Sequence, residues 1–404
     1  MTIEDKIRKT PRIYSVEFWR FIFTVIVTLY HLEILYQIKL MPSGTTAVEF
    51  FFVLAGFTIA MSAAGRIERG GARELGSKEA GALAWDYLKK KLLAIYPVLA
   101  VTLVLAIVVF PLLAPAVPMI PGTGNSSFLA RLGTLFSSEW EWLFMVGTPM
   151  GFNNTTASAA PIVPLWFLTQ LLLVGYLYTF LVNRKYDLMM FAAPLIAVLG
   201  FTFFVMNSEN ILDFYVKMGM FNAGTVRAIT NMAMGISIYR IYEYLKGRDW
   251  SIIGKIAFQL LELFAIYRYV SLTLRADVSI DNFRRIPYVL IIILLSFANI
   301  TFFSKLTNRK FMEKLGKLSL TMYLIHFPVA TAYWTVLFRL RRDNMAWSLP
   351  GILQKSGGMT PWQLPIPLSI GDLLMYIPIV IIISLLINLL VSSLRKLLRR
   401  KKPL

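Results

Sequence analysis

Residues Tyr14 to Ile38 read YSVEFWRFIFTVIVTLYHLEILYQI, and this stretch decides the fold that we expect. It is long and apolar enough to cross a bilayer as one helix, yet it contains ionisable side chains. At 100° per residue, a narrow polar stripe covering about 80° of arc is formed by Glu17, Arg20, Thr24, Thr28 and His31. Each ionisable group inside a bilayer costs roughly 2.5–3.5 kcal/mol, so such groups normally face a bundle interior and mark a pathway or a site. The alternative is that Arg20 snorkels to the cytoplasmic surface and His31 makes one buried hydrogen bond.

The composition indicates an integral membrane protein with many spans. Of the 404 residues, 57% are hydrophobic and 16% are charged, and apolar runs near 20 residues recur along the chain. The net charge of +19 could suggest a nucleic-acid partner, but the excess Lys and Arg residues lie at the ends of the apolar runs. The positive-inside rule therefore explains them, and we expect no nucleic acid. With no Cys and only two His, we also expect no disulfide, no thiolate nucleophile and no metal centre.

We predict an all-α membrane bundle, a single domain over 1–404, with about ten transmembrane helices and both termini cytoplasmic. Most Lys and Arg residues then fall on inner segments, including a basic inner loop at 65–91 and a basic tail at 395–404, whereas a long outer loop covers 113–163. Basic residues crowd one outer end within 251–345, so either that threading is wrong or an outward basic patch binds something anionic. The predicted spans are 14–38, 47–64, 92–112, 164–184, 188–206, 226–244, 251–274, 286–303, 316–338 and 371–394.

Two further segments carry candidate site residues, and on the first of them we expect Glu49 to lie at the depth of His31. Glu49 lies just inside the second span, where a carboxylate beside the imidazole would set its tautomer and raise its basicity, as a general base requires. The alternative partner for Glu49 is Lys39 at the membrane rim. In the ninth span Tyr323 and His326 share one helix face, and His326 is either a second site residue or a structural histidine.

Lys89, Lys90 and Lys91 place three ammonium groups at the cytoplasmic mouth of the third span. They could hold the phosphates of a soluble cofactor, or they could anchor the topology against anionic lipid. Trp166, at the outer end of the fourth span, is either an interface anchor or a platform on which an acceptor stacks.

Together these motifs resemble the acyltransferase-3 family of membrane-bound acyltransferases. The resemblance runs across most of the chain and rests on Glu17-Phe18-Trp19-Arg20, the ten-residue gap to His31, Phe51-Phe52-Val53-Leu54-Ala55-Gly56-Phe57, the basic run leading to Tyr96-Pro97, Leu165-Trp166-Phe167-Leu168, and Gly316 to Pro328. It implies transfer of an acyl group, usually acetyl, from cytoplasmic acyl-CoA to a hydroxyl of a glycan or glycolipid. In the family the residues that match Arg20 and His31 are needed for activity. The chain departs from the family at Ala94, where a second basic residue often stands three positions after the one matching Lys91. We expect no hydrolase-like domain after the tenth span, so the chain resembles the stand-alone members.

We therefore expect a membrane O-acyltransferase, in a bacterial inner or plasma membrane, that uses acyl-CoA without a metal. The predicted catalytic residues are His31 as general base, Arg20 and Glu49. The predicted donor-binding residues are Arg20, Lys89, Lys90 and Lys91, and the predicted acceptor-binding residues are Trp166, Tyr323 and His326. Whether an acyl-enzyme forms and which oligomer exists stay open. The competing hypothesis is a transporter or exporter of an anionic or glycan substrate, because intramembrane Arg and His serve proton-coupled transport equally well.

Overall fold

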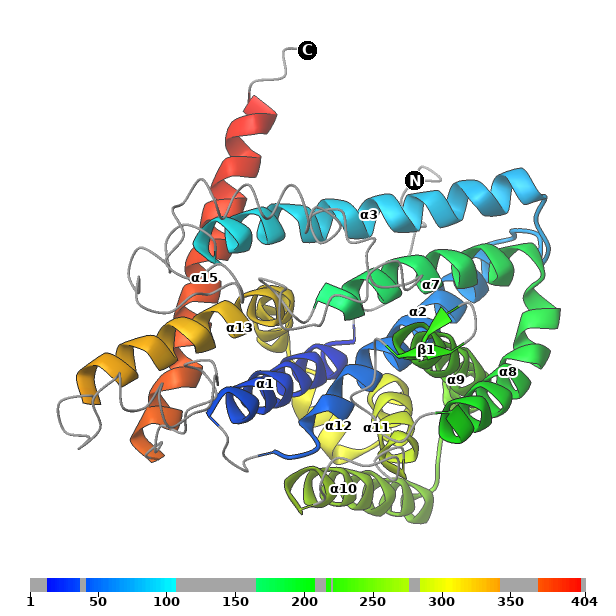
Figure 1. Cartoon of the computed structure of the whole chain (residues 1–404). Helices are drawn as coiled ribbons and strands as arrows, with labels where there is room; N and C mark the ends of the chain where they lie inside the picture. The colour runs from blue at the N-terminus through cyan, green and yellow to red at the C-terminus, as the bar shows by residue number, and fades with distance from the viewer. Residues whose placement is uncertain are drawn as a thin grey trace.

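The computed structural model describes residues 13–36, 41–106, 165–207, 216–218, 221–275, 284–341 and 370–400. In these ranges the fold is almost entirely helical, with one antiparallel hairpin formed by β1 (Lys217–Met218) and β2 (Phe221–Asn222). The helices are α1 (Ser15–Tyr36), η2 (Gly44–Thr46), α2 (Ala47–Glu68), α3 (Ser77–Val104), α7 (Leu165–Arg184), α8 (Tyr186–Asn207), α9 (Ala223–Leu245), α10 (Ile252–Arg275), α11 (Ile286–Ala298), α12 (Phe302–Thr307), α13 (Met312–Arg341) and α15 (Ile370–Arg400) (Figure 1).

The chain is an integral, multi-pass membrane protein. Among the described residues, six helices are long and apolar enough to cross a membrane, namely α1, α2 with η2, α7, α8, α10 and α15. Only 28% of the apolar stretch of α8 and 22% of that of α10 are buried inside the protein. Both helices therefore present broad apolar faces, as lipid-facing helices do. Each predicted span overlaps a helix, which confirms the all-α class; the count of ten spans and the cytoplasmic termini stay predictions.

The predicted span 286–303 is wrong as one continuous helix. Helix α11 ends at Ala298, and Asn299 adopts a left-handed backbone conformation with φ of 53°. Asparagine tolerates this conformation better than most residues, so it terminates the helix. The Thr301 hydroxyl then accepts the Ser304 backbone N–H at 3.1 Å and caps the short helix α12.

The segment predicted as the inner loop 65–91 is largely helical. Helix α2 continues to Glu68, and α3 already begins at Ser77, where the Glu79 carboxylate accepts the Gly76 backbone N–H at 3.2 Å. The predicted outer loop 113–163 lies outside the described residues. Within the predicted tail 395–404, helix α15 extends to Arg400.

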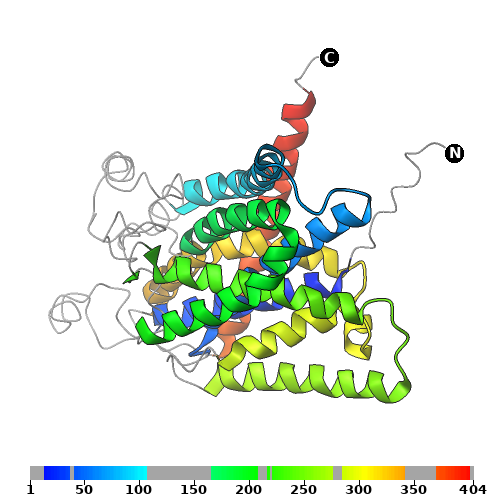
Figure 2. The ribbon, with the colours of Figure 1, turned by 90° about the vertical axis from the view of Figure 1, so that its right-hand side faces the viewer.

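The centre of the bundle is built on two helix pairs, α2 with α9 and α1 with α13. In both views α3 lies on one side of this centre and α10 on the other (Figures 1 and 2). The α2–α9 crossing is close because glycines face backbone on both sides. A Cβ atom at Gly56 would lie 1.9 Å from the Met232 carbonyl oxygen, and one at Gly235 would lie 2.0 Å from the Val53 carbonyl oxygen. Small residues at a crossing allow membrane helices to pack backbone to backbone.

Candidate functional site

The polar stripe of α1 faces the bundle interior, as the sequence predicts. Glu17 is 9% exposed, and Thr24 and Thr28 are fully buried. Arg20 donates from Nη1 to Glu17 Oε2 at 2.8 Å, and the Thr24 hydroxyl donates to the Arg20 carbonyl oxygen at 2.8 Å. The Arg20 side chain keeps 34% of its surface exposed, so its guanidinium is paired but still accessible.

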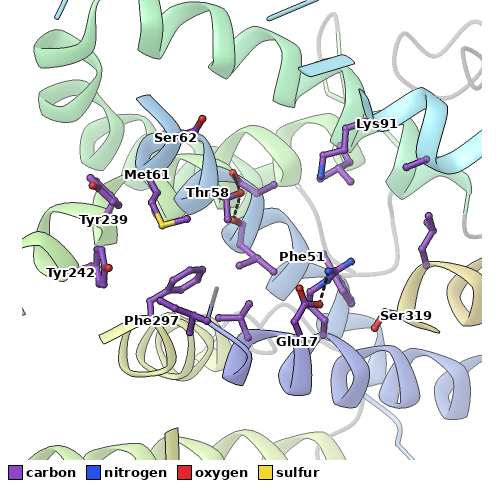
Figure 3. Close-up of a pocket in the computed structure, with 18 of the residues that line it drawn as sticks. Glu17, Phe51, Thr58, Met61, Ser62, Lys91, Tyr239, Tyr242, Phe297 and Ser319 are labelled. Atoms are coloured by element: carbon purple, nitrogen blue, oxygen red, sulfur yellow. Dashed lines mark hydrogen bonds and ion pairs between the residues drawn. The ribbon is translucent and has the colours of Figure 1, made fainter. Parts of the chain in front are cut away.

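A cavity of about 890 Å³ opens beside this stripe, between α1, α2, α3, α7, α9, α11 and α13. Figure 3 shows Tyr239, Tyr242 and Met61 at one side of it and Glu17 and Ser319 at the other, with Lys91 reaching in from α3. The cavity is lined by the start of α1, the ends of α2 and α9, and the middle of α3. The predicted topology puts all of these segments toward the cytoplasmic side of the membrane. Its walls combine aromatic and aliphatic side chains with a few charged groups, the usual make-up of a small-molecule pocket.

Four cationic side chains line the cavity, namely Arg20, Arg69, Lys91 and Lys246. Lys246 pairs with Glu68 at 2.9 Å. Lys91 lies just before the apolar part of α3, and burial together with the nearby charge of Arg20 lowers its pKa. Such an arrangement holds positive charge in a confined space, where an anionic ligand would relieve the repulsion.

The structure separates the three predicted donor-binding lysines. Only Lys91 lines the cavity. Lys89 is exposed, and Lys90 forms an exposed ion pair with Asp86 at 2.6 Å. One turn beyond Lys91, Ala94 also lines the cavity, so no cation from that position enters it.

His31 and His326, the two histidines of the chain, meet between α1 and α13. Their rings lie 4.8 Å apart between centroids, and His326 Nε2 lies 3.1 Å from His31 Nδ1. His326 is fully buried, and the Tyr376 hydroxyl donates to its backbone carbonyl at 2.9 Å. The sequence predicted both residues as candidates but did not predict that they touch.

The cavity ends short of the two histidines. Of its lining residues, Tyr323 lies beside the histidine pair, with its ring centroid 5.8 Å from that of His326. On α1 the lining reaches Thr24, seven residues before His31, which is about 10 Å along a helix. The cationic groups and the imidazoles therefore lie at different depths of the same bundle.

Glu49 does not hold His31 in the way that the sequence suggested. Arg227 donates from Nε to Glu49 Oε1 at 2.8 Å, and Asn231 donates to the other carboxylate oxygen. Among the hydrogen bonds of the described residues, none joins Glu49 to His31. Lys39, the alternative partner, lies outside the described residues. The Trp166 indole is 6% exposed and lies 5.1 Å from the Arg227 guanidinium, so it covers this ion pair.

Sequence reasoning missed Arg227 and Asn231, although a signal was present. Arg227 falls within the predicted span 226–244, where an ionisable group calls for a partner inside the protein. Choosing Glu49 as that partner needs the packing of α2 on α9, which the sequence alone does not give. Arg69 and Lys246 were missed because they cap the ends of α2 and α9, where a cation is expected for topology alone.

Comparison with known proteins identifies the family. The family model described as an acyltransferase domain, Acyl_transf_3, matches residues 13–393, which is nearly the whole chain. Neither the comparison with curated proteins nor that with solved structures finds a match. The match spans the polar stripe, the cavity and both histidines, and it shows that the chain belongs to the acyltransferase-3 family of membrane acyltransferases.

Proposed function

We propose that the protein transfers an acyl group, most simply acetyl, from cytoplasmic acyl-CoA to a hydroxyl of a cell-surface glycan or glycolipid. The observation that supports this best is the cavity, whose lining combines four cationic side chains with aromatic and aliphatic ones. Coenzyme A has matching chemistry, with anionic phosphates at its nucleotide end and a neutral arm that ends in the thioester. We place this enzyme in a bacterial inner or plasma membrane.

In this proposal Arg69, Lys91 and Lys246 bind the phosphates of the donor. Arg69 and Lys246 follow the last turns of α2 and α9, at what the charge pattern predicts to be the cytoplasmic side. Cationic side chains form strong, charge-assisted hydrogen bonds to phosphate oxygens. The neutral arm then extends past Arg20 toward Tyr323, which brings the thioester toward the histidine pair.

His31 acts as the general base. The acceptor hydroxyl gives its proton to the imidazole while its oxygen forms a bond to the thioester carbonyl carbon. The carbon–sulfur bond then breaks, and the proton moves from the imidazolium to the departing CoA thiolate, so that the products are an ester and a free thiol. General-base assistance of this kind is worth roughly 10²–10⁴-fold in rate. Arg20 contributes positive charge near the donor arm, and Tyr323 lines the cavity between that arm and the histidine pair.

Label transfer tests the proposal. Purified protein in liposomes is given acetyl-CoA labelled in its acetyl group, together with envelope membranes from cells that lack the protein as the source of acceptor. We expect alkali-labile label in the glycan or glycolipid fraction and release of CoA thiol. A thiol reagent measures this release against a control without acetyl-CoA, and the chain itself adds no signal because it has no Cys. For His31→Ala we expect a rate lower by roughly 10²–10⁴-fold with an unchanged unfolding temperature.

The competing transporter hypothesis gives the opposite result in the same assay. A transporter of an anionic or glycan substrate consumes no acetyl-CoA and releases no thiol, and its His31→Ala variant changes uptake alone. Full acetyl transfer by His31→Ala would show that the protein is an acyltransferase and that His31 is not its general base.

A further inference from the structure

We infer that His326 is a positioning residue that holds His31 as its Nδ1–H tautomer and leaves His31 Nε2 free to accept a proton. The catalytic meaning of this inference rests on the proposed function. The tautomer itself does not, since it follows from one contact within each of two helices and one contact between them.

The first two contacts place a hydrogen on Nδ1 of each histidine. His31 Nδ1 lies 2.9 Å from the Val27 carbonyl oxygen, and His326 Nδ1 lies 3.2 Å from the Met322 carbonyl oxygen. A carbonyl oxygen only accepts hydrogen bonds, so each of these ring nitrogens must be the donor. In a neutral imidazole the other nitrogen, Nε2, then has a free lone pair.

The third contact joins the two rings in the same sense. His326 Nε2 lies 3.1 Å from His31 Nδ1, so the lone pair of His326 faces the N–H of His31. A proton added to His326 Nε2 would place two N–H groups against each other, so the contact requires a neutral His326. The single Nδ1 hydrogen of His31 is therefore shared between the Val27 carbonyl oxygen and His326 Nε2, and His326 in turn donates from Nδ1 to the Met322 carbonyl oxygen of α13.

His326 is itself held in place more firmly than His31. It is fully buried in α13, and its backbone carbonyl accepts the Tyr376 hydroxyl of α15 at 2.9 Å. The Val27 carbonyl, by contrast, belongs to the same helix as His31 and already accepts the His31 backbone N–H. His326 is therefore the acceptor that ties the His31 ring to a second helix.

This pair does the work that a carboxylate does beside many catalytic histidines. A general base needs a third group that sets its tautomer and orientation. Here a neutral imidazole supplies it, because Glu49 is already engaged by Arg227 and Asn231. When His31 Nε2 takes the acceptor proton, the resulting imidazolium donates more strongly from Nδ1 to His326. The proton then passes from Nε2 to the CoA thiolate, and His326 keeps its protonation state throughout.

Nitrogen NMR of histidine tests the tautomer directly. The protein is labelled with ¹⁵N-histidine and reconstituted in lipid, and only two histidines contribute to the spectrum. We expect both to appear as neutral Nδ1–H tautomers, although free neutral histidine favours Nε2–H. In His326→Leu the single remaining histidine should shift toward Nε2–H. An Nε2–H signal from His31 in the unmodified protein, or an unchanged His31 spectrum in His326→Leu, would overturn the inference.

Kinetics separates positioning from a purely structural role. His326→Leu should lose a large part of the general-base factor of roughly 10²–10⁴ in kcat, with KM for acetyl-CoA changed by less than about twofold. His326→Gln keeps an oxygen that can accept from His31 Nδ1, so it should recover at least about tenfold of the lost kcat. Equal rates for the Leu and Gln variants, or full activity in His326→Leu, would contradict positioning. If the unmodified protein transfers no acyl group, the proposed function fails, while the NMR spectrum still decides the tautomer.

Discussion

Glu49 of α2 and Arg227 of α9 form an ion pair in which each side chain is 1% exposed. Arg227 Nε lies 2.8 Å from Glu49 Oε1, and Asn231, one turn further along α9, donates to Oε2. The pair lies on the same two helices as the Gly56–Gly235 crossing. Charge and backbone contact therefore hold α2 and α9 together at two different points.

Loss of the Glu49 charge should destabilise the bundle severely. Glu49→Gln leaves the Arg227 guanidinium buried without a counter-charge, and breaking a buried pair in this way typically costs about 3–5 kcal/mol. We expect a large drop in the unfolding temperature in detergent, measured by intrinsic tryptophan fluorescence. The double variant Glu49→Leu with Arg227→Met should recover much of the loss, because neither charge is then stranded. A single variant as stable as the unmodified protein would show that water or lipid reaches the site.

Lys91→Ala should weaken donor binding selectively. Lys91 is the lysine of the 89–91 run that lines the cavity, and a hydrogen bond to a charged group is worth about 1.5–3 kcal/mol. We expect KM for acetyl-CoA to rise at least about tenfold with little change in kcat. The matched control is Lys78→Ala, which removes an exposed ammonium near the start of the same helix. Equal effects from both variants would mean that bulk surface charge, and not this position, attracts the donor.

Donor binding should also depend on pH through Lys91. Burial and the charge of Arg20 lower the pKa of Lys91, so in the ligand-free protein its ammonium is lost at a lower pH than that of an ordinary lysine. The charged form binds phosphate, so affinity for CoA is full below this pKa and falls as pH rises through it. Calorimetric titrations with CoA at increasing pH measure the effect. Lys91→Arg, whose guanidinium stays charged, should remove the decline, and an identical decline in that variant would assign it to another group.

Gly56→Ala should destabilise the α2–α9 crossing. The added Cβ would lie 1.9 Å from the Met232 carbonyl oxygen, so the two backbones must move apart. Overpacking of this kind typically costs about 1–3 kcal/mol. Gly81→Ala is the control, because a Cβ at Gly81 of α3 meets nothing within 4 Å and alanine favours a helix by about 0.5–1 kcal/mol. Opposite shifts in unfolding temperature are expected, and equal shifts would contradict the close crossing.

Patterns within a single helix predicted much of this structure. The spacing of Glu17, Thr24 and Thr28 predicted which face of α1 is buried, because side-chain direction along a helix follows from local geometry alone. The break at Asn299 was missed because the apolar run continues through it, and hydropathy does not register one left-handed residue.

Patterns within a single helix did not predict the contacts between helices. Glu49 and His31 could be placed at similar depths, but depth does not determine direction around the bundle axis. Arg227, which lies 178 positions after Glu49, therefore decided where the carboxylate points. The contact between His31 and His326 likewise depends on how α1 packs on α13, and no spacing within either segment encodes it.

The cationic side chains of the cavity lie apart from the two imidazoles, and this separation has an electrical consequence. In the proposed function, Arg69, Lys91 and Lys246 would hold the charged phosphates of acyl-CoA at the cytoplasmic side. Only the uncharged arm that carries the thioester would then extend into the bundle. Work against a membrane voltage is proportional to the charge that is moved, so carrying a neutral group inward costs none. Under the proposed function, the rate of acyl transfer should therefore be independent of the membrane potential.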